Sequence, residues 1–410
     1  RKLSVYDEAP FLEMIKLIRS ADVAFTNFEM LLHDYEPYPM HKSGGTYMRA
    51  KPSMAKELVW AGFDMVSTAN NHTGDYGTQG MRLTLKYLND YGLVNAGAGE
   101  SLEEAREAKF IETSKGRVAL ISCASTFPDH SRAGTSRGDT NSRPGLSPLR
   151  FSTEFIVTKE HFDNIKKLKE ELNPNKFNQK DLKEISFSGR NYRVGENNEV
   201  ITKTNQKDLK EIERVVRSSV HMADYTIVTI HAHESDQIKS VPAKFLTEFA
   251  RKMIDAGADV VVGHGPHVLR GIEIYKEKPI FYSLANFMFQ NETLLRVPEE
   301  NYARYNLGAD AQINDWNAKR YANDTRGFPT EREIWESVIA VPKWNKGNLF
   351  KIELYPITLG FRKKRTVRGR PMFTNKTLGK KIITDLIERS KPFGTKIEYK
   401  DGIGIINIKN

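Results

Sequence analysis

The stretch at residues 260–289 constrains the fold more than any other part of this sequence. An apolar run at 258–262 leads into Gly263-His264-Gly265-Pro266-His267, and two further short apolar runs follow and end at Asn286. Glycine gives the backbone the freedom to turn sharply after a buried strand, and an imidazole at such a place is a frequent metal ligand or acid–base group. The stretch therefore predicts a buried strand with a metal site or an acid–base pocket at its end.

Short apolar strands alternate with segments of helical periodicity along most of the chain. We expect helices at 7–18, 52–60, 78–91, 241–256 and 376–389, and strands at 21–28, 63–69, 93–99, 118–125, 225–230, 258–263 and 350–357. Two hairpins are expected, one at 272–284 and one at 396–408 around Asp401-Gly402. This alternation indicates an α/β layered fold.

Two parts of the chain depart from this pattern. Residues 151–223 are rich in Lys, Asn and Glu, and the octet NQKDLKEI occurs there twice, at 178–185 and 205–212. We predict a peripheral helical insertion, with a helix starting in each octet and a hairpin at 189–200. The main domain is expected to span 1–290 and to be followed at 291–410 by a C-terminal α+β extension that packs on the core and opens with a polar, loop-rich segment at 290–334.

Composition limits the classes of partner and site. The net charge of +10 favours anionic partners, but zinc-finger, RNP-type and basic-zipper patterns are missing, so we do not expect nucleic acid. A single cysteine, Cys123, excludes an internal disulfide and a cysteine-based zinc site.

No window approaches the roughly 20 apolar residues of a membrane span, and we expect no transmembrane segment and no signal peptide in this chain. Because it opens with Arg1, we expect residues upstream, and both cytoplasmic and cell-envelope locations stay open.

Polar side chains follow four of the predicted strands at the points where those strands end. In open α/β sheets, sites form at the carboxyl ends of strands, so these side chains are expected to share one crevice. Imidazoles bind zinc, manganese or iron, and carboxylate and amide oxygens complete such a sphere, while the same groups without metal serve as acid and base. The residues are Asn27, Glu29, Asn71, His72, His231, His233, Glu234, His264 and His267.

Each of these residues also has a purely structural interpretation. Asn71-His72 alone fits a turn, Asp75 fits the N-cap of the next helix, and Glu234 fits a solvated loop charge. His264 fits a capping role near Gly265-Pro266. Four such motifs at four strand ends favour a site over four independent coincidences.

A loop at 125–150 supplies candidate anion-binding groups. It holds four arginines and no lysine, in a chain otherwise rich in lysine. The planar guanidinium binds carboxylate or phosphate through two parallel hydrogen bonds, so we expect this loop to fold over the crevice as a lid; the alternative is a flexible surface loop. Asp129 and His130 of the loop are further candidates. The expected substrate-binding arginines are Arg49, Arg132, Arg137, Arg143 and Arg150.

The segments TNFE, NNHTGDYG, HAHES and GHGPHVLRGIEIYKEKPIFYSLANF together resemble the bacterial capsule synthesis CapA family of poly-γ-glutamate biosynthesis (PGA_cap). The resemblance covers roughly residues 1–290. That family is similar in fold to the calcineurin-like metallophosphoesterases, so the resemblance implies a four-layer αββα sandwich with a site at the strand ends. It also implies that Asn71 binds metal, that His72 acts as an acid or contacts phosphate, and that His231, His264 and His267 occupy further ligand positions.

The chain departs from the family pattern at three points. A Gly-Asp that usually ends the first strand is expected to lie upstream of Arg1. Glu29 stands where the phosphoesterases have a metal-bridging Asp, and His233 stands where many relatives have an aromatic residue. A one-metal site and a metal-free site therefore both stay open.

Our leading hypothesis is a hydrolase or transferase that acts on an anionic, γ-glutamyl or peptide-like, or capsule polymer substrate. We expect Glu29 and the four histidines His72, His231, His264 and His267 to be catalytic, Asn286 to join the arginines in binding substrate, and any cofactor to be a divalent Zn, Mn or Fe ion. One alternative is a non-catalytic, polyanion-binding subunit of a capsule synthesis complex. Another is a metal-independent acid–base enzyme, such as an epimerase, or a phosphodiesterase.

Overall fold

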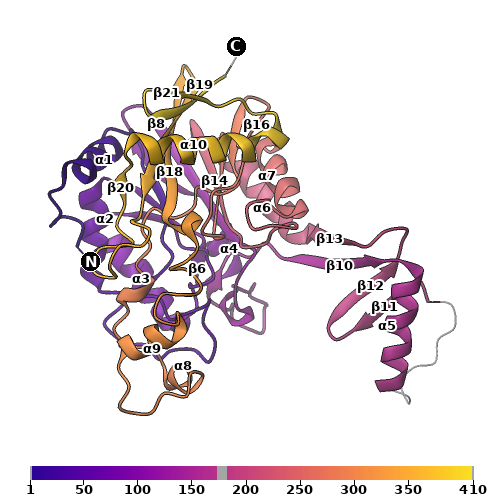
Figure 1. Ribbon diagram of the computed structural model, residues 1–410. Coiled ribbons are helices and arrows are strands. Elements are labelled where there is room, and N and C mark those ends of the chain that lie inside the picture. The colour runs from indigo at the N-terminus through magenta and orange to yellow at the C-terminus, as the bar shows by residue number, and fades with distance from the viewer. Residues whose placement is uncertain (1, 173–181, 409–410) are drawn as a thin grey trace.

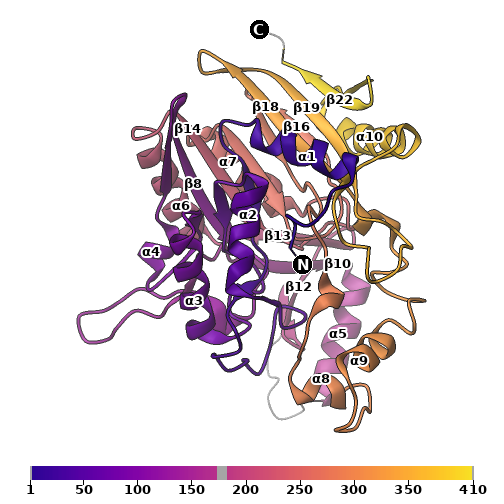
Figure 2. The same ribbon diagram turned by 90° about the vertical axis from the view of Figure 1, so that its left-hand side faces the viewer.

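The computed structural model describes residues 2–172 and 182–408. Two facing β-sheets form its centre, and helices cover their outer sides (Figures 1 and 2). The helices are α1 (Ala9–Arg19), α2 (Ala55–Ala61), α3 (Gly77–Asp90), α4 (Leu102–Arg106), α5 (Lys159–Leu172), α6 (Gln206–Ser219), α7 (Lys244–Asp255), α8 (Glu299–Ala303), α9 (Ile313–Arg320) and α10 (Lys376–Ser390).

The larger central sheet has six strands in the order β16-β17-β15-β14-β8-β7. The four inner strands are parallel, whereas β16 and β7 pair antiparallel at the two edges. Parallel strands buried on both faces consist of continuous apolar runs, and such runs predicted the strands at 118–125, 225–230 and 258–263, whereas the edge strand at Lys109–Thr113 was not predicted. The strands are β7 (Lys109–Thr113), β8 (Gly116–Ala124), β14 (Tyr225–His231), β15 (Val260–His264), β16 (Ile272–Tyr275) and β17 (Lys278–Phe281).

The smaller central sheet is parallel, in the order β1-β4-β5. Its strands are β1 (Phe25–Asn27), β4 (Met65–Ser67) and β5 (Val94–Ala96). Met65 and Ala96 of this sheet share a buried apolar cluster with Val118 and Leu120 of β8, which joins the two sheets face to face.

Helices complete the outer layers of the sandwich. Apolar residues of α1, α2 and α3 pack with Val66 of β4 in one cluster, and those of α6 and α7 pack with β8, β14 and β15 in another. Layers therefore follow in the order helix, sheet, sheet, helix, and the predicted layered α/β fold is confirmed.

The C-terminal residues add a further sheet, in the order β18-β19-β22-β21, with β20 paired to β19. Its strands are β18 (Glu336–Asn345), β19 (Asn348–Thr358), β20 (Met372–Phe373), β21 (Glu398–Lys400) and β22 (Ile403–Asn407). Residues of β19, β22 and α10 share an apolar cluster with Ile272 and Phe281 of the central sheet. The helix predicted at 376–389 and the hairpin around Asp401-Gly402 are confirmed, whereas β18, which contains Pro342, was not predicted. The segment expected to be loop-rich also holds the short helices α8 and α9.

Residues 151–204 form an arm that projects from the body of the molecule (Figure 1). The arm is a four-stranded sheet in the order β11-β12-β10-β13, with α5 beside it. The strands are β10 (Phe151–Val157), β11 (Glu184–Phe187), β12 (Arg190–Val194) and β13 (Glu199–Thr204). The predicted insertion holds a helix, α5, but the four-stranded sheet beside it was not predicted, and the hairpin turn lies at Ser188-Gly189, at the start of the expected hairpin.

The two copies of the repeated octet adopt different structures. The second copy caps and begins α6, where the Asn205 side chain accepts a hydrogen bond from the Asp208 amide. The helix is not peripheral as predicted, because Leu209, Ile212 and Val216 are buried in the central core. Residues 178–181 of the first copy lie outside the described residues, while Glu184 and Ile185 begin β11, so the described part of this copy is not helical.

Short strand pairs fix the loops that border the strand ends. Strands β2 (Leu31–Leu32) and β3 (Arg49–Ala50) close the loop between them, and β6 (Ala98–Gly99) pairs with β9 (Gly145–Leu146) within the 125–150 loop. Among the residues that the structure describes, no helix combines the length and apolar character needed to cross a bilayer.

Candidate functional site

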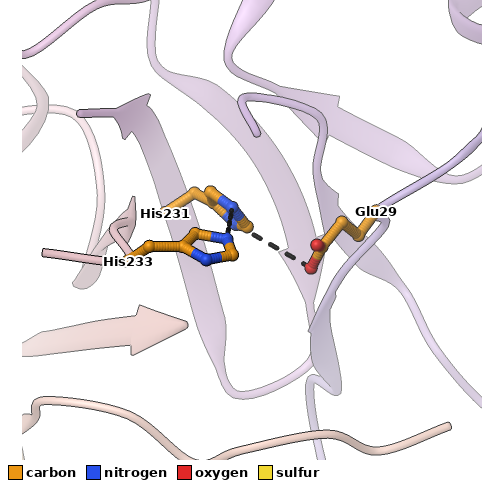
Figure 3. A group of neighbouring side chains, drawn as sticks. All are labelled: Glu29, His231 and His233. Atoms are coloured by element: carbon orange, nitrogen blue, oxygen red, sulfur yellow. Dashed lines mark hydrogen bonds and ion pairs between the residues drawn. The ribbon is translucent and has the colours of Figure 1, made fainter. Parts of the chain in front are cut away.

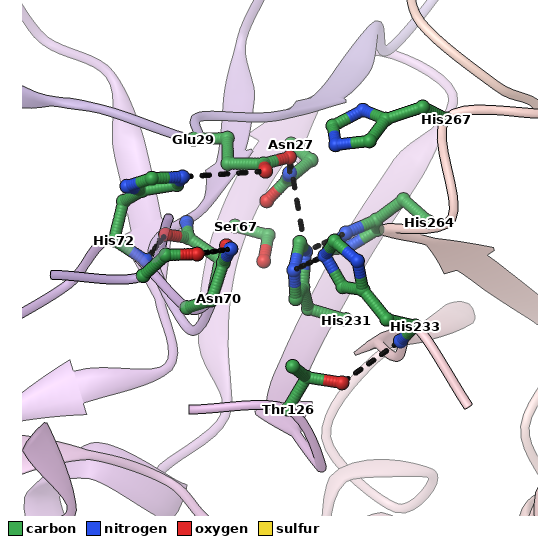
Figure 4. Close-up of polar contacts among 12 residues, drawn as sticks. Asn27, Glu29, Ser67, Asn70, His72, Thr126, His231, His233, His264 and His267 are labelled. Atoms are coloured by element: carbon green, nitrogen blue, oxygen red, sulfur yellow. Dashed lines mark hydrogen bonds and ion pairs between the residues drawn. The ribbon is translucent and has the colours of Figure 1, made fainter. Parts of the chain in front are cut away.

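The carboxyl ends of four parallel strands meet at one edge of the two central sheets (Figure 4). His231 and His264 are the last residues of β14 and β15, and the strand register places them side by side. Asn27 ends β1 and is followed by Glu29, while Ser67 ends β4 and is followed by the turn that carries His72. The fold thus brings residues from four distant parts of the chain into one polar cluster.

Glu29, His231 and His233 form the tightest group in this cluster (Figure 3). One potential ligand atom from each residue lies within 4.8 Å of the others. Oε2 of Glu29 is 3.9 Å from Nδ1 of His231, and Nε2 of His231 is 3.0 Å from Nε2 of His233. One carboxylate and two imidazoles at this spacing form a donor set that suits zinc, manganese or iron.

The buried imidazoles form a hydrogen-bonded chain with an assignable direction. The Thr229 hydroxyl donates to the Val262 carbonyl, so it accepts from Nε2 of His264 at 2.9 Å. Nδ1 of His264 is then an acceptor and lies 3.0 Å from Nδ1 of His231. In the same way, a neutral His231 accepts at Nε2 from His233.

The pKa directions of these rings agree with that assignment. Burial lowers the pKa of His264 to about 3. Burial and then the neighbouring His267 lower the pKa of His233 to about 3, and burial followed by His233 and His264 lowers the pKa of His231 well below 6.5. Neutral imidazole is the form that binds a metal ion.

Glu29 lies among these rings and is oriented by Asn27. Nδ2 of Asn27 donates to Oε2 of Glu29 at 3.1 Å, and burial raises the pKa of Glu29 against the opposing effects of His267 and His72. Oδ1 of Asn27 is buried without a hydrogen-bond partner among the described residues. Buried polar atoms normally have a partner. A cation bound beside the Glu29 carboxylate and the two imidazoles would be a suitable partner for this oxygen.

His72 faces the same cluster from the opposite side. Nε2 of His72 is 4.0 Å from Oε1 of Glu29, and Nδ1 is 2.7 Å from Oδ2 of Asp75. Burial alone would lower the pKa of His72, but the charge and hydrogen bond of Asp75 outweigh it, so the pKa is raised above 6.5. Asp75 is fully buried and also accepts from the amides of Gly44 and Met48.

Asn70 and Asn71 precede His72 in the turn at residues 70–72 (the NNH turn), and the two side chains make different hydrogen bonds. Asn70 accepts from the His72 amide at 3.0 Å and donates to the Phe28 carbonyl at 2.9 Å, so it fixes the turn. Asn71 donates to the Gly44 carbonyl at 2.7 Å, and its Oδ1 is buried without a hydrogen-bond partner among the described residues. Its role as a metal ligand stays a prediction.

His267 borders the cluster and is oriented by Asn286. Nδ2 of Asn286 donates to the Ile334 carbonyl, so its Oδ1 accepts from Nδ1 of His267 at 2.9 Å. This bond leaves Nε2 of His267 unprotonated in the neutral ring. The His267 ring also contacts Phe289 and Phe328, and its backbone has φ of 61°. Asn286 thus positions a histidine, which is a different contact from the substrate contact expected from the sequence.

Four of the five predicted arginines have a partner for their side chain. Arg49 lies over the Tyr35 ring and pairs with Asp34, Arg137 pairs with Asp139, and Nε of Arg143 donates to the Arg132 carbonyl. Arg150 forms two hydrogen bonds with the buried Asp208 at the base of the arm. Binding of substrate by these arginines stays a prediction.

The sequence placed His233 and Asn27 in the crevice without a role, and it did not place Asp75 there. His233 lies in the tightest group, and the signal for it was the His-x-His spacing, since alternate residues at a strand end share a face. Asp75 was interpreted as a helix N-cap, but α3 begins at Gly77 and Asp75 instead holds His72.

Known proteins are similar to this chain over most of its length. The family model described as bacterial capsule synthesis protein PGA_cap matches residues 4–291. An uncharacterized protein, y4sH, of Sinorhizobium fredii is 38% identical over 413 residues, which covers 97% of this chain and 88% of that protein. The capsule biosynthesis protein CapA of Bacillus anthracis is 27% identical over 292 residues, covering 71% of this chain and 56% of that one.

Two further proteins are similar to this chain at lower sequence identity. A probable polyglutamine synthesis accessory protein of Mycobacterium tuberculosis is 25% identical over 214 residues, 52% of this chain and 42% of that protein. Among solved structures, a phosphatase of Mycoplasma pneumoniae superposes with a TM-score of 0.36 and 10% identity over 84% of this chain and 79% of its own.

Proposed function

This chain belongs to the bacterial capsule synthesis protein PGA_cap family, and we propose that it is a hydrolase or transferase acting on an anionic γ-glutamyl or capsule polymer. Similarity to capsule biosynthesis proteins named CapA in two Bacillus species supports the substrate class. The observation that carries an enzymatic role is the position of the His72–Asp75 pair opposite Glu29, His231 and His233 in one cluster, in which Glu29 and His233 are only partly buried.

Three residues would hold a divalent metal ion in this proposal. Glu29, His231 and His233 supply one oxygen and two nitrogen ligands within a small volume, and the unpartnered Oδ1 of Asn27 lies beside them. A divalent ion bound there would act as a Lewis acid on the carbonyl of the bond to be broken. His264 and Thr229 orient His231 from behind, as second-layer partners of metal-binding histidines commonly do.

His72 is the proposed proton donor to the leaving group. Asp75 holds the proton on Nδ1 and directs Nε2 toward the cluster. A histidine oriented by a buried carboxylate is a common arrangement in acid–base catalysis, where it contributes roughly 10²–10⁴-fold in rate. His267, fixed by Asn286, presents its second nitrogen at the edge of the same cluster.

The proposal is tested by turnover of a defined polymer. The protein is loaded separately with Zn²⁺, Mn²⁺ and Fe²⁺ and incubated with γ-linked glutamate oligomers, and new amino groups are measured. Wild type is expected to release them, and His72→Asn is expected to be at least about 100-fold slower. His161→Asn, a histidine exposed at the start of α5, is the matched control. Absence of turnover with all three ions, or equal rates for wild type and His72→Asn, would overturn the proposal.

A non-catalytic role in a capsule synthesis complex is the second candidate. It is favoured by the similarity to a probable polyglutamine synthesis accessory protein of Mycobacterium tuberculosis and by the net charge of +10, which attracts polyanions. Cells carrying His72→Asn in place of wild type would then keep normal polymer production. Loss of production, with the variant present at normal abundance, would exclude this candidate.

A further inference from the structure

Arg270 is the largest fully buried side chain of the described residues, and it lies three residues after His267. Among the described residues, its guanidinium donates to backbone carbonyls alone, and its buried Nη1 has no hydrogen-bond partner. Nε donates to Lys239 at 3.1 Å, and Nη2 donates to His233 at 3.3 Å and to Glu234 at 2.8 Å. Burial lowers the pKa of Arg270 to about 10. A buried cation held by carbonyls is costly to maintain, which points to a role that an apolar side chain could not fill.

The carbonyls that Arg270 binds belong to the loop that carries His233. The opposite side of this loop is fastened to the end of β8. The His233 amide donates to the Thr126 hydroxyl at 2.8 Å, and that hydroxyl donates to Oε1 of Glu234 at 2.8 Å. Ser125 donates to the second carboxylate oxygen of Glu234 at 2.6 Å. Both backbone polar groups of His233 are therefore fixed, the amide by Thr126 and the carbonyl by Arg270.

The His233 ring depends on this double attachment for its position. Because His233 follows the last residue of β14 by two positions, the hydrogen bonds of the sheet end before it. Its ring nevertheless lies 3.0 Å from His231 and within the group that includes Glu29. We propose that Arg270 is a positioning residue that, with Thr126 opposite, clamps the His233 loop so that His233 completes the Glu29–His231 group.

Lysine cannot replace Arg270 in this role. The planar guanidinium directs separate N–H groups at carbonyls of residues 233, 234 and 239, whereas an ammonium is a single point charge on a flexible stem. A purely structural role would make any Arg270 variant less stable without a specific effect on His233. The clamp of the His233 loop is independent of the proposed function. Its effect on metal binding rests on the proposed function, in which Glu29, His231 and His233 hold a metal ion.

The experiment measures Co²⁺ binding by the full chain through the visible absorption of the bound ion. Arg270→Lys is expected to weaken binding by about 10–100-fold, the usual cost of losing support for a metal ligand. Arg251→Lys is the control, because Arg251 is partly exposed on α7 and pairs with Glu273. In a His233→Ala background, Arg270→Lys is expected to add less than a twofold loss, since the residue acts through His233.

A second measurement reads His233 without any metal. Diethyl pyrocarbonate modifies accessible neutral imidazoles, and peptide mass spectrometry gives the rate for His233 in chelator-treated protein. The rate is expected to rise several-fold in Arg270→Lys and to stay unchanged in Arg251→Lys. If Arg270→Lys does not fold, Thr126→Ala is measured in its place, with the same expectation.

The two measurements separate the proposals. If wild type binds no Co²⁺, the metal site fails and the modification rate alone decides the role of Arg270. An unchanged His233 modification rate in the folded variant would overturn the clamp. The clamp would also be overturned if Arg270→Lys weakened Co²⁺ binding equally in the wild-type and the His233→Ala backgrounds.

Discussion

Oδ2 of Asp75 lies 2.7 Å from Nδ1 of His72, inside a turn where Asp75 has no exposed surface. The same carboxylate accepts the amides of Gly44 at 2.8 Å and Met48 at 2.9 Å. These contacts tie the loop before β3 to the NNH turn and direct Nε2 of His72 toward Glu29. The residue that orients the proposed acid therefore also organises one wall of the site.

Asp75→Asn is expected to lower turnover by about 10²–10⁴-fold, because an amide does not hold the His72 proton on Nδ1. The measurement is kcat on the γ-linked glutamate oligomer, with folding checked by circular dichroism. Asp90→Asn, an exposed pair with Lys86 on α3, is the matched control and should leave kcat unchanged. Equal kcat values for Asp75→Asn and wild type would show that His72 does not act through Asp75.

Gly44→Ala is expected to distort the turn that carries Asn71 and His72. A Cβ at position 44 would lie 2.3 Å from the Asn71 carbonyl oxygen, whereas a Cβ at position 138 would meet nothing within 4 Å. Steric overpacking of this kind costs about 1–3 kcal/mol. Urea unfolding should show that loss for Gly44→Ala and almost none for Gly138→Ala. A Gly44→Ala protein as stable and as active as the control would contradict the close approach of these two backbones.

Asp208 makes acid stability depend on the base of the arm. Burial would raise its pKa, but hydrogen bonds from Arg150 and Arg106 outweigh this and lower it. The stabilisation of the folded protein by ionised Asp208 is therefore complete above the unfolded-state pKa of about 4. It is lost as the pH falls through the lower pKa of Asp208 in the folded state.

Asp208→Asn should thus lose about 1–3 kcal/mol at pH 7, because the buried Arg106 loses one of its two charged partners and keeps Glu211. Urea unfolding at pH 7 and pH 3 measures the difference between wild type and variant, which should shrink at the lower pH. A difference that is the same at both pH values would rule out the lowered pKa as its source.

Local pattern was enough to predict the central layers. The parallel strands β8, β14 and β15 are apolar runs because both of their faces are buried, and the amphipathic period of α7 and α10 shows which side each helix buries. Strand-end polar motifs pointed to the site because parallel strands end at a common edge. These features depend on residues close together in sequence.

Features set by distant contacts were not predictable in this way. The octet NQKDLKEI begins helix α6 in one place, where its apolar residues meet the core, and its other copy ends in strand β11, where β12 offers a pairing edge. Asp75 looked like a helix cap because its partners Gly44 and Met48 lie about thirty residues away. Arg150 looked like an anion-binding group because Asp208 is distant in sequence.

The most direct test of the metal site is anomalous diffraction from crystals grown with Zn²⁺, Mn²⁺ or Co²⁺, combined with elemental analysis of the same protein. We expect about one tightly bound ion per chain, with Glu29, His231 and His233 as ligands at about 2.0–2.2 Å. Glu29→Gln combined with His233→Ala should abolish that peak. A wild-type protein that binds none of these ions, or binds them only away from Glu29, His231 and His233, would contradict the account.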